Sequence, residues 1–404
     1  MQQLHEISNR LIDSTKTVFF RNLYSLINWE NRLIEIQGAR GTGKTTLMLQ
    51  KAKELQNSGK SVLYISLDIP FFYKNQLFET AENFYKYGGQ YLFIDEVHKY
   101  PQKQKQIDWA QEIKNIYDTI PALKIIYSGS SILQLYNSLG DLSRRKSNYR
   151  LSGLSFREYL HFYNGLIFNA LTLNEILNNH QDICSEIINK VKILPEFQSY
   201  LNYGYYPFYK ENPEKYFDRI ADIINVIIET DIPYITNIAY ETLFKFKQLL
   251  SAITSTVPYS LNLSNLSSEL YITDQRTLIK YLNLLEKAEL INTLGAKVIG
   301  NKIFNKPQKI YLNNTNLMYA VDKNNIRSGT IRETFFLNQL KYAHNVNYTK
   351  TGDFIIDNNL TFEIGGKNKT NKQIKTVENA FLAIDNIESG FADKIPLWLF
   401  GFLY

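Results

Sequence analysis

The chain is poor in cysteine and in long apolar runs. Cys184 is the only cysteine among 404 residues, which excludes an intramolecular disulfide framework and a cysteine-ligated zinc site. No apolar run approaches the roughly 18 residues that a membrane-spanning helix needs, and the N-terminal sequence MQQLHEISNR is too polar for a signal peptide. Residues 395–404 are apolar but include Pro396 and Gly401, so we expect a buried final segment. These absences predict a reduced, cytoplasmic protein with no membrane partner.

The excess of positive over negative charge is also small. The 45 Lys and Arg against 39 Asp and Glu give a formal net charge of +6, which permits a nucleic-acid partner without arguing for one. Aromatic residues are abundant, with 29 Tyr and 24 Phe, and predict aromatic-rich cores. The length predicts roughly two to four domains.

Strand-like and helix-like segments alternate in the first third of the chain. Apolar β-rich runs occupy residues 32–37, 61–68, 91–95 and 123–130, and helical patterns lie between them. This alternation predicts an α/β fold in which helices cover both faces of a parallel sheet. Ligands of such sheets lie beyond the carboxyl ends of the strands, which is where the polar motifs below fall.

The stretch GARGTGKTT at residues 38–46 has the pattern G-x-x-x-x-G-K-[ST] between a predicted strand and a predicted helix. Its glycines let successive backbone N–H groups point at phosphate oxygens, and the helix N-terminus adds partial positive charge. Lys44 is predicted to reach the β- and γ-phosphates, and the Thr45 hydroxyl to ligate Mg²⁺. The residues predicted to bind the nucleotide are Gly38, Ala39, Arg40, Gly41, Thr42, Gly43, Lys44, Thr45 and Thr46.

Polar residues also follow the next apolar strands. Asp95 and Glu96 end the run YLFIDE, and we assign Asp95 to the magnesium shell and Glu96 to the attacking water. Ser128, or else Ser130, follows the strand LKII and is expected to touch the γ-phosphate or its water. The structural alternatives are a solvated loop at the two carboxylates and a serine-rich turn after LKII.

Arg144 and Arg145 are candidates for a charge-stabilising arginine that acts in cis or on a neighbouring molecule. The alternative is a pair of ordinary surface arginines. The guanine-reading pattern N-K-x-D is absent, since Asn301-Lys302 is followed by Ile-Phe. ATP is therefore favoured over GTP, with Mg²⁺ as the cofactor.

Four stretches in order, GARGTGKTT, YLFIDEVHKYPQ, IIYSGSSILQL and DLSRRKSNYRLSGLSFREYL, resemble the AAA-type P-loop ATPases of bacteria and archaea that carry a C-terminal DUF4143 domain. YLNYGYYPFY at 200–209 is similar to the helical lid segment of that family, and the likeness covers nearly the whole chain. It implies an AAA+/STAND-like core, a helical lid, a winged helix and a domain resembling PD-(D/E)xK nucleases. The expected bounds are 1–152 for the core, 153–238 for the lid, 239–321 for the winged helix and 330–404 for the terminal domain, with a linker at 322–329.

The pattern of residues 263–291 supports the winged helix independently of the resemblance. A helix, a turn and a second amphipathic helix follow one another, and Thr273 is the expected N-cap of the second. In a DNA-binding helix-turn-helix this second helix would present Gln275, Arg276 and Lys280 to the major groove. The lysines that would contact phosphates from a wing are Lys297, Lys302, Lys306 and Lys309. The alternative is a winged helix that packs against protein.

The resemblance to nucleases rests on IRETFFLNQL, TGDF and TFEIGGKNK, which supply Glu333, Asp353 and Glu363. Such enzymes need carboxylates for the metal and a lysine for the hydroxide, but Gly365 stands where the lysine should be. Lys367 preserves strand parity and could serve only if the two glycines bulge. The preferred interpretation is a degenerate domain that binds nucleic acid or a partner, for which Lys367, Lys369, Lys372 and Lys375 are suited.

The leading hypothesis is an Mg²⁺-dependent ATPase that drives a conformational switch. Its C-terminal half would engage DNA or another protein, and a nucleotide-dependent homo-oligomer is consistent with the family. The alternatives are an ATP-dependent nuclease, which Gly365 disfavours, and an ATP-binding regulatory or assembly protein that does not hydrolyse. A small-molecule kinase is the weakest alternative, since nothing offers an acceptor site.

Overall fold

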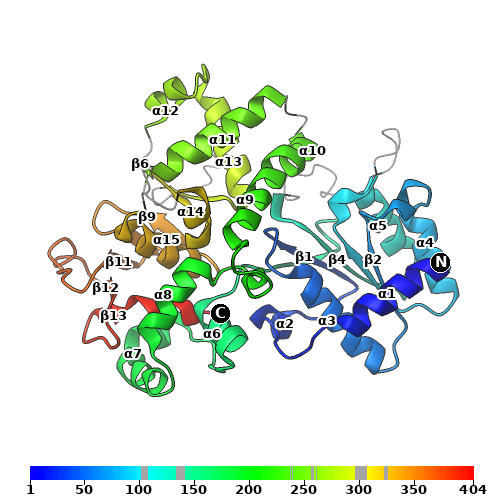
Figure 1. Cartoon of the computed structure of the whole chain (residues 1–404), viewed down its shortest axis with the longest axis horizontal. Helices are drawn as coiled ribbons and strands as arrows, with labels where there is room; N and C mark the ends of the chain where they lie inside the picture. Colours follow the sequence, from blue (N-terminus) through cyan, green and yellow to red (C-terminus); the bar gives the residue numbers. More distant parts are fainter. Residues whose placement is uncertain are drawn as a thin grey trace. The chain divides into compact units, whose positions relative to one another are not determined.

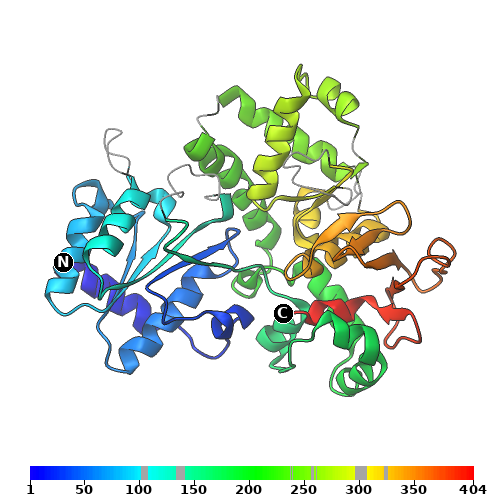
Figure 2. The ribbon, with the colours of Figure 1, turned by 180° about the vertical axis from the view of Figure 1, so that it is seen from behind.

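The computed structural model describes residues 1–101, 108–132, 142–236, 238, 240–255, 259–260, 262–295, 307–322 and 326–404. The chain forms two compact units, Met1–Gly153 and Leu154–Tyr404 (Figure 1, and from behind in Figure 2). The mixed α/β class predicted from the sequence is confirmed. The finer division of the second unit into lid, winged helix and terminal domain stays a prediction.

A five-stranded parallel sheet forms the centre of the first unit. Its strands are β1 Leu33–Gly38, β2 Val62–Ser66, β3 Tyr91–Asp95, β4 Lys124–Ser130 and β5 Ser147–Arg150, in the spatial order β2-β3-β4-β1-β5. The first four are the predicted apolar runs. The polar sequence SNYR does not predict β5, which pairs with β1 at the edge of the sheet. From β1 the chain passes over β4 and β3 to reach β2, so the end of β1 is a topological switch point, where ligands of such sheets bind.

Helices cover both faces of this sheet (Figure 1). On one face α1 Gln2–Ser14, α2 Asn22–Leu26 and α3 Lys44–Asn57 share an apolar cluster with alternate strand residues such as Ile36 and Phe93. On the other face lie α4 Leu77–Lys86 and α5 Trp109–Thr119, where the ring centroids of Trp109 and Tyr127 are 5.9 Å apart. Successive strand side chains point to opposite faces, so the continuous apolar runs serve both layers. The short 3-10 helices η1 Pro70–Tyr73 and η2 Val97–Lys99 follow β2 and β3.

The second unit begins with a run of helices. These are α6 Phe156–Asn164, α7 Leu173–Ile188, α8 Ile193–Tyr203, α9 Tyr216–Val226, α10 Ile232–Thr236 and α11 Tyr240–Ser255, with 3-10 helix η5 Pro207–Lys210 and π-helical η6 Ile227–Asp231 between them. Capping boxes start α6 at Ser155 and α7 at Thr172, each paired with a Glu three residues on. Cys184 is buried on α7, as expected of a small apolar side chain.

A three-stranded sheet and two short helices follow α11. They are β6 Tyr259–Ser260, α12 Leu263–Glu269, α13 Gln275–Lys287, β7 Ile291–Leu294 and β8 Lys309–Leu312, with β8 central and antiparallel to both neighbours. The predicted N-cap at Thr273 is wrong: Asp274 caps α13, because its carboxylate accepts from the Arg276 N–H. Lys297, Lys302 and Lys306 lie outside the described residues. α14 Thr315–Val321 closes this region.

The last part is a mixed sheet with one long helix. α15 Ser328–Leu340 begins inside the stretch predicted as a linker, and the strands are β9 Val346–Tyr348, β10 Phe354–Ile356, β11 Leu360–Gly365, β12 Ala380–Ile384 and β13 Lys394–Pro396. Their order is β13-β12-β11-β10-β9, with β9, β10 and β11 antiparallel and β11, β12 and β13 parallel. The 3-10 helix η7 Leu397–Phe402 is buried throughout, as expected of the apolar final segment.

Candidate functional site

The loop between β1 and α3 depends on three glycines for different reasons. Gly41 and Gly43 have φ of 80° and 97°, a region that L side chains rarely adopt. Gly38 instead lies against the chain that follows β5, where an added Cβ would be closer than 3.0 Å to the carbonyl oxygen of Leu151. The loop therefore has room for backbone alone on one side.

Lys44 opens α3 and turns back over the loop. Its side chain is buried, and Nζ donates to the carbonyl oxygens of Gly38 and Ala39 at 2.9 Å each. The first N–H groups of a helix have no partner within it, so the start of α3 offers donors and a positive dipole end beside the ammonium. Thr42 closes the loop from within, as its hydroxyl donates to the Ala39 carbonyl at 2.9 Å.

Asp95 brings three elements together at the carboxyl end of β3. It is 2% exposed, and its Oδ2 accepts from the Thr45 hydroxyl at 2.6 Å. Its Oδ1 accepts from the Ser128 hydroxyl of β4 and from the Glu96 N–H at 3.0 Å. Thr45, Asp95 and Ser128, which the sequence analysis singled out separately, are thus in direct contact.

Tyr64 is a member of this group that the sequence analysis missed. It lies on β2, and its hydroxyl donates to Asp95 Oδ2 at 2.7 Å. Burial, followed by the negative charge of Asp95, raises the pKa of the phenol, so Tyr64 keeps its proton and remains a donor. A tyrosine inside an apolar strand looks like an ordinary core residue, and only the pairing of β2 with β3 places it beside Asp95.

Glu96 lies between the phosphate loop and the 3-10 turn η2. It adopts a left-handed conformation with φ of 52°, which costs on the order of 1 kcal/mol or more for such a residue and is often found at functional sites. Its Oε2 is 3.1 Å from His98 Nε2 and 4.0 Å from an Arg40 guanidinium nitrogen. The Nη2 atom of Arg40 is also 3.3 Å from His98 Nε2. The three polar side chains therefore lie in mutual contact.

Arg21 braces the loop from the other side. It is 7% exposed, and its guanidinium donates to the carbonyl oxygens of Thr42 at 2.7 Å, Ser152 at 2.7 Å and Gly153 at 2.8 Å. One arginine thereby ties the phosphate loop to the residues that end the first unit. Nothing in the local sequence around Arg21 indicates this role.

The arginine pair is not brought to the phosphate loop. Arg145 binds Asp118 at the end of α5 through two hydrogen bonds of 2.9 and 3.1 Å. Both residues precede strands, whereas the phosphate loop follows one, so they lie at the opposite edge of the parallel sheet. This placement does not favour a role for Arg145 in cis, which stays a prediction. Arg144 is exposed, and its action on a neighbouring molecule stays a prediction.

The terminal carboxylates form a second polar group, within the second unit. The Tyr311 hydroxyl donates to Glu333 Oε2 at 2.6 Å, and Lys309 Nζ is 3.9 Å from both Glu333 and Asp353. Asp353 Oδ2 in turn accepts from the N–H of Ile364 at 2.8 Å. Burial, and then the charge of Asp353, raises the pKa of Glu333 to about 7.

The lysine near Glu363 is not the one that the sequence analysis chose. Lys367 is exposed, whereas Lys369 forms an ion pair with Glu363. The Cβ, Cγ and Cδ atoms of Lys369 all lie within 3.0 Å of where a Cβ on Gly365 would be, so this side chain fills the space that glycine leaves. Burial also raises the pKa of Glu363. Among the described residues no group of three or more His, Cys, Asp or Glu is arranged to hold a metal ion.

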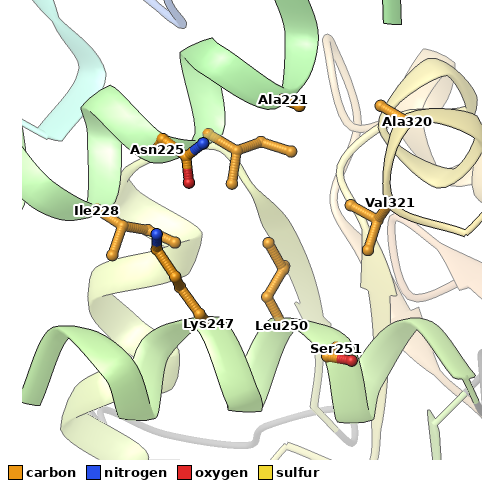
Figure 3. Close-up of a pocket in the computed structure, with 9 residues that line it drawn as sticks. Ala221, Asn225, Ile228, Lys247, Leu250, Ser251, Ala320 and Val321 are labelled. Carbon is orange, nitrogen blue, oxygen red and sulfur yellow. The ribbon is translucent and has the colours of Figure 1, made fainter. Parts of the chain in front are cut away.

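The second unit has two further features that could bind a ligand or a partner, an exposed helix face and a pocket. Gln275, Arg276 and Lys280 are exposed on α13, as their predicted role requires. A pocket of about 170 Å³ lies among α9, α11 and α14, and Figure 3 shows its largely aliphatic wall. Lys247 at its rim is already paired with Glu229 at 2.6 Å. No helix in the described part of the chain is long and apolar enough to cross a membrane.

Two family models match parts of this sequence. Residues 30–160 match the model described as an AAA domain. Residues 194–328 match one described as a domain of unknown function, DUF8612. The latter spans the expected boundary at 238 and ends before the terminal domain, so the DUF4143 assignment stays a prediction.

One curated protein and several solved structures are similar to parts of this chain. The uncharacterised protein MJ1637 of Methanocaldococcus jannaschii is 31% identical over 290 residues, or 70% of this chain, and the chain spans 61% of that protein. AMPPCP-bound DnaA from Aquifex aeolicus is 15% identical, with 70% of this chain and 88% of that one covered and a TM-score of 0.27. The Aeropyrum pernix Orc1 protein in complex with DNA is 10% identical, with 79% and 92% covered and a TM-score of 0.32. These TM-scores are too low to describe a shared arrangement of the whole chain.

Proposed function

We propose that the protein binds ATP with Mg²⁺ and hydrolyses it, and that hydrolysis drives a conformational switch acting on nucleic acid or a protein partner. The observation that carries the proposal is the contact of Asp95 with both Thr45 and Ser128 at the mouth of a glycine-rich loop. The start of α3 and the C-terminal parts of β3 and β4 meet there at one carboxylate. The match of residues 30–160 to an AAA domain supports the same conclusion.

The donor set fits magnesium. Mg²⁺ takes oxygen ligands and usually keeps several waters, and the hydroxyl of Thr45 and the carboxylate of Asp95 are both oxygen donors that already meet at 2.6 Å. When bound, the ion would neutralise charge that develops on the phosphates. Tyr64 orients Asp95 from the protein side.

The remaining roles follow from charge and position. Phosphate oxygens would replace the carbonyl partners of Lys44, which presents its ammonium at the start of α3 beside the dipole end. Glu96 follows Asp95 directly and is the carboxylate suited to orient the attacking water. We assign to Ser128 the contact with the terminal phosphate, and its hydrogen bond to Asp95 supports this role.

Arg21 supports the switch part of the proposal. Its guanidinium bonds both the phosphate loop and the carbonyls of Ser152 and Gly153, which lead into the second unit. A shift of the loop on nucleotide binding would therefore move Arg21 and, with it, Ser152 and Gly153 at the end of the first unit. The partner is proposed to be DNA or a protein bound through the second unit, where Gln275, Arg276 and Lys280 are exposed, and nucleotide-dependent self-association is an assembly to test.

The test is the ATPase rate of wild type and of a Glu96→Gln variant, each with and without DNA, RNA and protein extract. We expect Glu96→Gln to bind ATP with Mg²⁺ and to hydrolyse it about 100-fold or more slowly, as for loss of a general base. A variant that binds ATP and turns it over at the wild-type rate would refute hydrolysis at this site. Stimulation by one addition identifies the class of partner.

A second candidate function, an ATP-dependent nuclease, has one observation in its favour. Lys369 crosses Gly365 and brings an ammonium to Glu363, which answers the objection that glycine removes the lysine. It ranks second because Lys309 and Lys369 already neutralise the carboxylates. Cleavage of DNA with Mg²⁺ or Mn²⁺ that is lost on Asp353→Ala would move it to first place.

A further inference from the structure

We infer that Arg40 exchanges partners during the reaction. It pairs with Glu96 and His98 in the structure, and the terminal phosphate of ATP draws it away so that Glu96 can accept the attacking water. This inference rests on the proposed function, since it concerns the same phosphate site. It assigns positioning roles to Arg40 and His98 that the loop pattern does not require.

Arg40 reaches from the phosphate loop to Glu96. It occupies a variable position of the loop, immediately after Ala39, whose carbonyl already bonds the Lys44 ammonium. Its guanidinium nevertheless turns to Glu96, which follows the magnesium-binding position Asp95. Arg40 therefore reaches the end of the site at which the terminal phosphate would lie.

Glu96 and the terminal phosphate would compete for one cation, the guanidinium of Arg40. Glu96 offers Arg40 a single negative charge at 4.0 Å, with both side chains only about a fifth exposed, at 23% and 22%. A terminal phosphate carries more charge, and its oxygens match the guanidinium fork in two parallel hydrogen bonds. Partial burial strengthens both interactions, but it favours the more highly charged and better matched partner.

The His98 side chain is 3% exposed and lies beside both Arg40 and Glu96. Its Nε2 lies 3.3 Å from Arg40 and 3.1 Å from Glu96. A single ring nitrogen can accept from the guanidinium or donate to the carboxylate, but not both. With its proton on Nε2, His98 donates to Glu96 Oε2 both before and after Arg40 leaves, so that no proton has to move, and the other carboxylate oxygen is assigned to the attacking water.

The experiment is a double-mutant cycle on equilibrium binding of ATP and ADP with Mg²⁺, using Arg40→Ala, Glu96→Gln and the double variant. If the phosphate takes Arg40 from Glu96, then Glu96→Gln removes a competitor, and ATP binds roughly three- to tenfold more tightly when Arg40 is present. The gain should be clearly smaller with alanine at position 40. ADP, which lacks the terminal phosphate, should show no such difference.

If Arg40 keeps its contact with Glu96 when ATP binds, the gain in ATP affinity should be larger in the alanine background than with Arg40 present. If Arg40 stays on Glu96, it screens that carboxylate, and Glu96→Gln relieves more repulsion of ATP when position 40 is alanine. An equal or larger gain in the alanine background, or the same pattern with ADP, overturns the inference. Arg40→Gln serves as a second variant in case alanine disturbs the loop, and Arg10→Ala, an exposed arginine on α1, is the charge-matched control.

The outcome separates the two proposals. If the wild-type protein does not bind ATP at all, the proposed function is refuted. Binding of ATP that Lys44→Ala abolishes, together with a cycle that shows no dependence on Arg40, would leave the function standing and refute this inference alone.

Discussion

Glu333 gives the protein a pH-dependent stability whose sign and size follow from its surroundings. The carboxyl is 16% exposed and lies near Asp353, and its pKa is raised from 4.5 to about 7 by burial and by that neighbouring charge. The unfolded chain loses this proton near 4.5, whereas the folded protein keeps it until about 7. The free energy of unfolding therefore falls as pH rises through this window.

The size of the change in the free energy of unfolding follows from the pKa of Glu333 in the unfolded and folded states. A pKa of about 7 in place of 4.5 corresponds to about 3 kcal/mol of stability that is present below the unfolded value and lost above the folded one. Glu333→Gln keeps the shape and the hydrogen bond from Tyr311 but cannot ionise. The variant should become more stable than wild type by an amount that grows from about pH 4.5 to about pH 7.

Urea unfolding of the full chain across this range, followed by circular dichroism and tryptophan fluorescence, measures the difference at each pH. Comparing wild type with the variant cancels the titrating groups far from Glu333, whereas Asp353 and Glu363 interact with Glu333 and contribute to the difference. Glu186→Gln, whose carboxylate is 68% exposed, is the matched control for the substitution itself. A stability difference for Glu333→Gln that is flat with pH, or that shrinks as pH rises, would refute the reasoning.

Two further predictions concern the phosphate site. Gly38→Ala should destabilise the protein by about 1–3 kcal/mol, because the new Cβ meets the Leu151 carbonyl; thermal unfolding measures this, and Gly329→Ala, which meets nothing within 4 Å, is the control. A Gly38→Ala protein as stable as that control would contradict the geometry. Tyr64→Phe removes one donor from Asp95 and should raise the Mg²⁺ concentration needed for half-maximal ATPase activity severalfold, a loss of about 1 kcal/mol. An unchanged Mg²⁺ titration would show that Tyr64 does not position Asp95.

The phosphate loop could be found from the sequence because its chemistry is local. Glycines at fixed spacing, a lysine and a threonine lie within one strand-loop-helix segment, and each does its work through neighbouring backbone. Asp95 and Ser128 could be found because each ends an apolar strand. In a parallel sheet the carboxyl ends of the strands share one edge, so residues far apart in the chain could be expected to lie close together.

Other members of the sites could not be found in this way. Tyr64 and Arg21 act across elements, and in the sequence they look like a core tyrosine and an ordinary surface arginine. Strand parity favours Lys367, but β11 ends at Gly365, and the turn that follows returns Lys369 over that glycine. Arg145 pairs with Asp118 at the edge of the sheet where the strands begin, and the local sequence does not predict this contact.

The sequence alone therefore determined the α/β class, the phosphate loop and the expectation of ATP with Mg²⁺, since these depend on residue order over short stretches. The tertiary structure decided which side chains meet: Asp95 with Tyr64, Arg40 with Glu96 and His98, and Lys369 with Glu363. Such contacts depend on strand order and on where turns direct side chains. No short stretch of sequence records either, because both are set by the packing of distant elements.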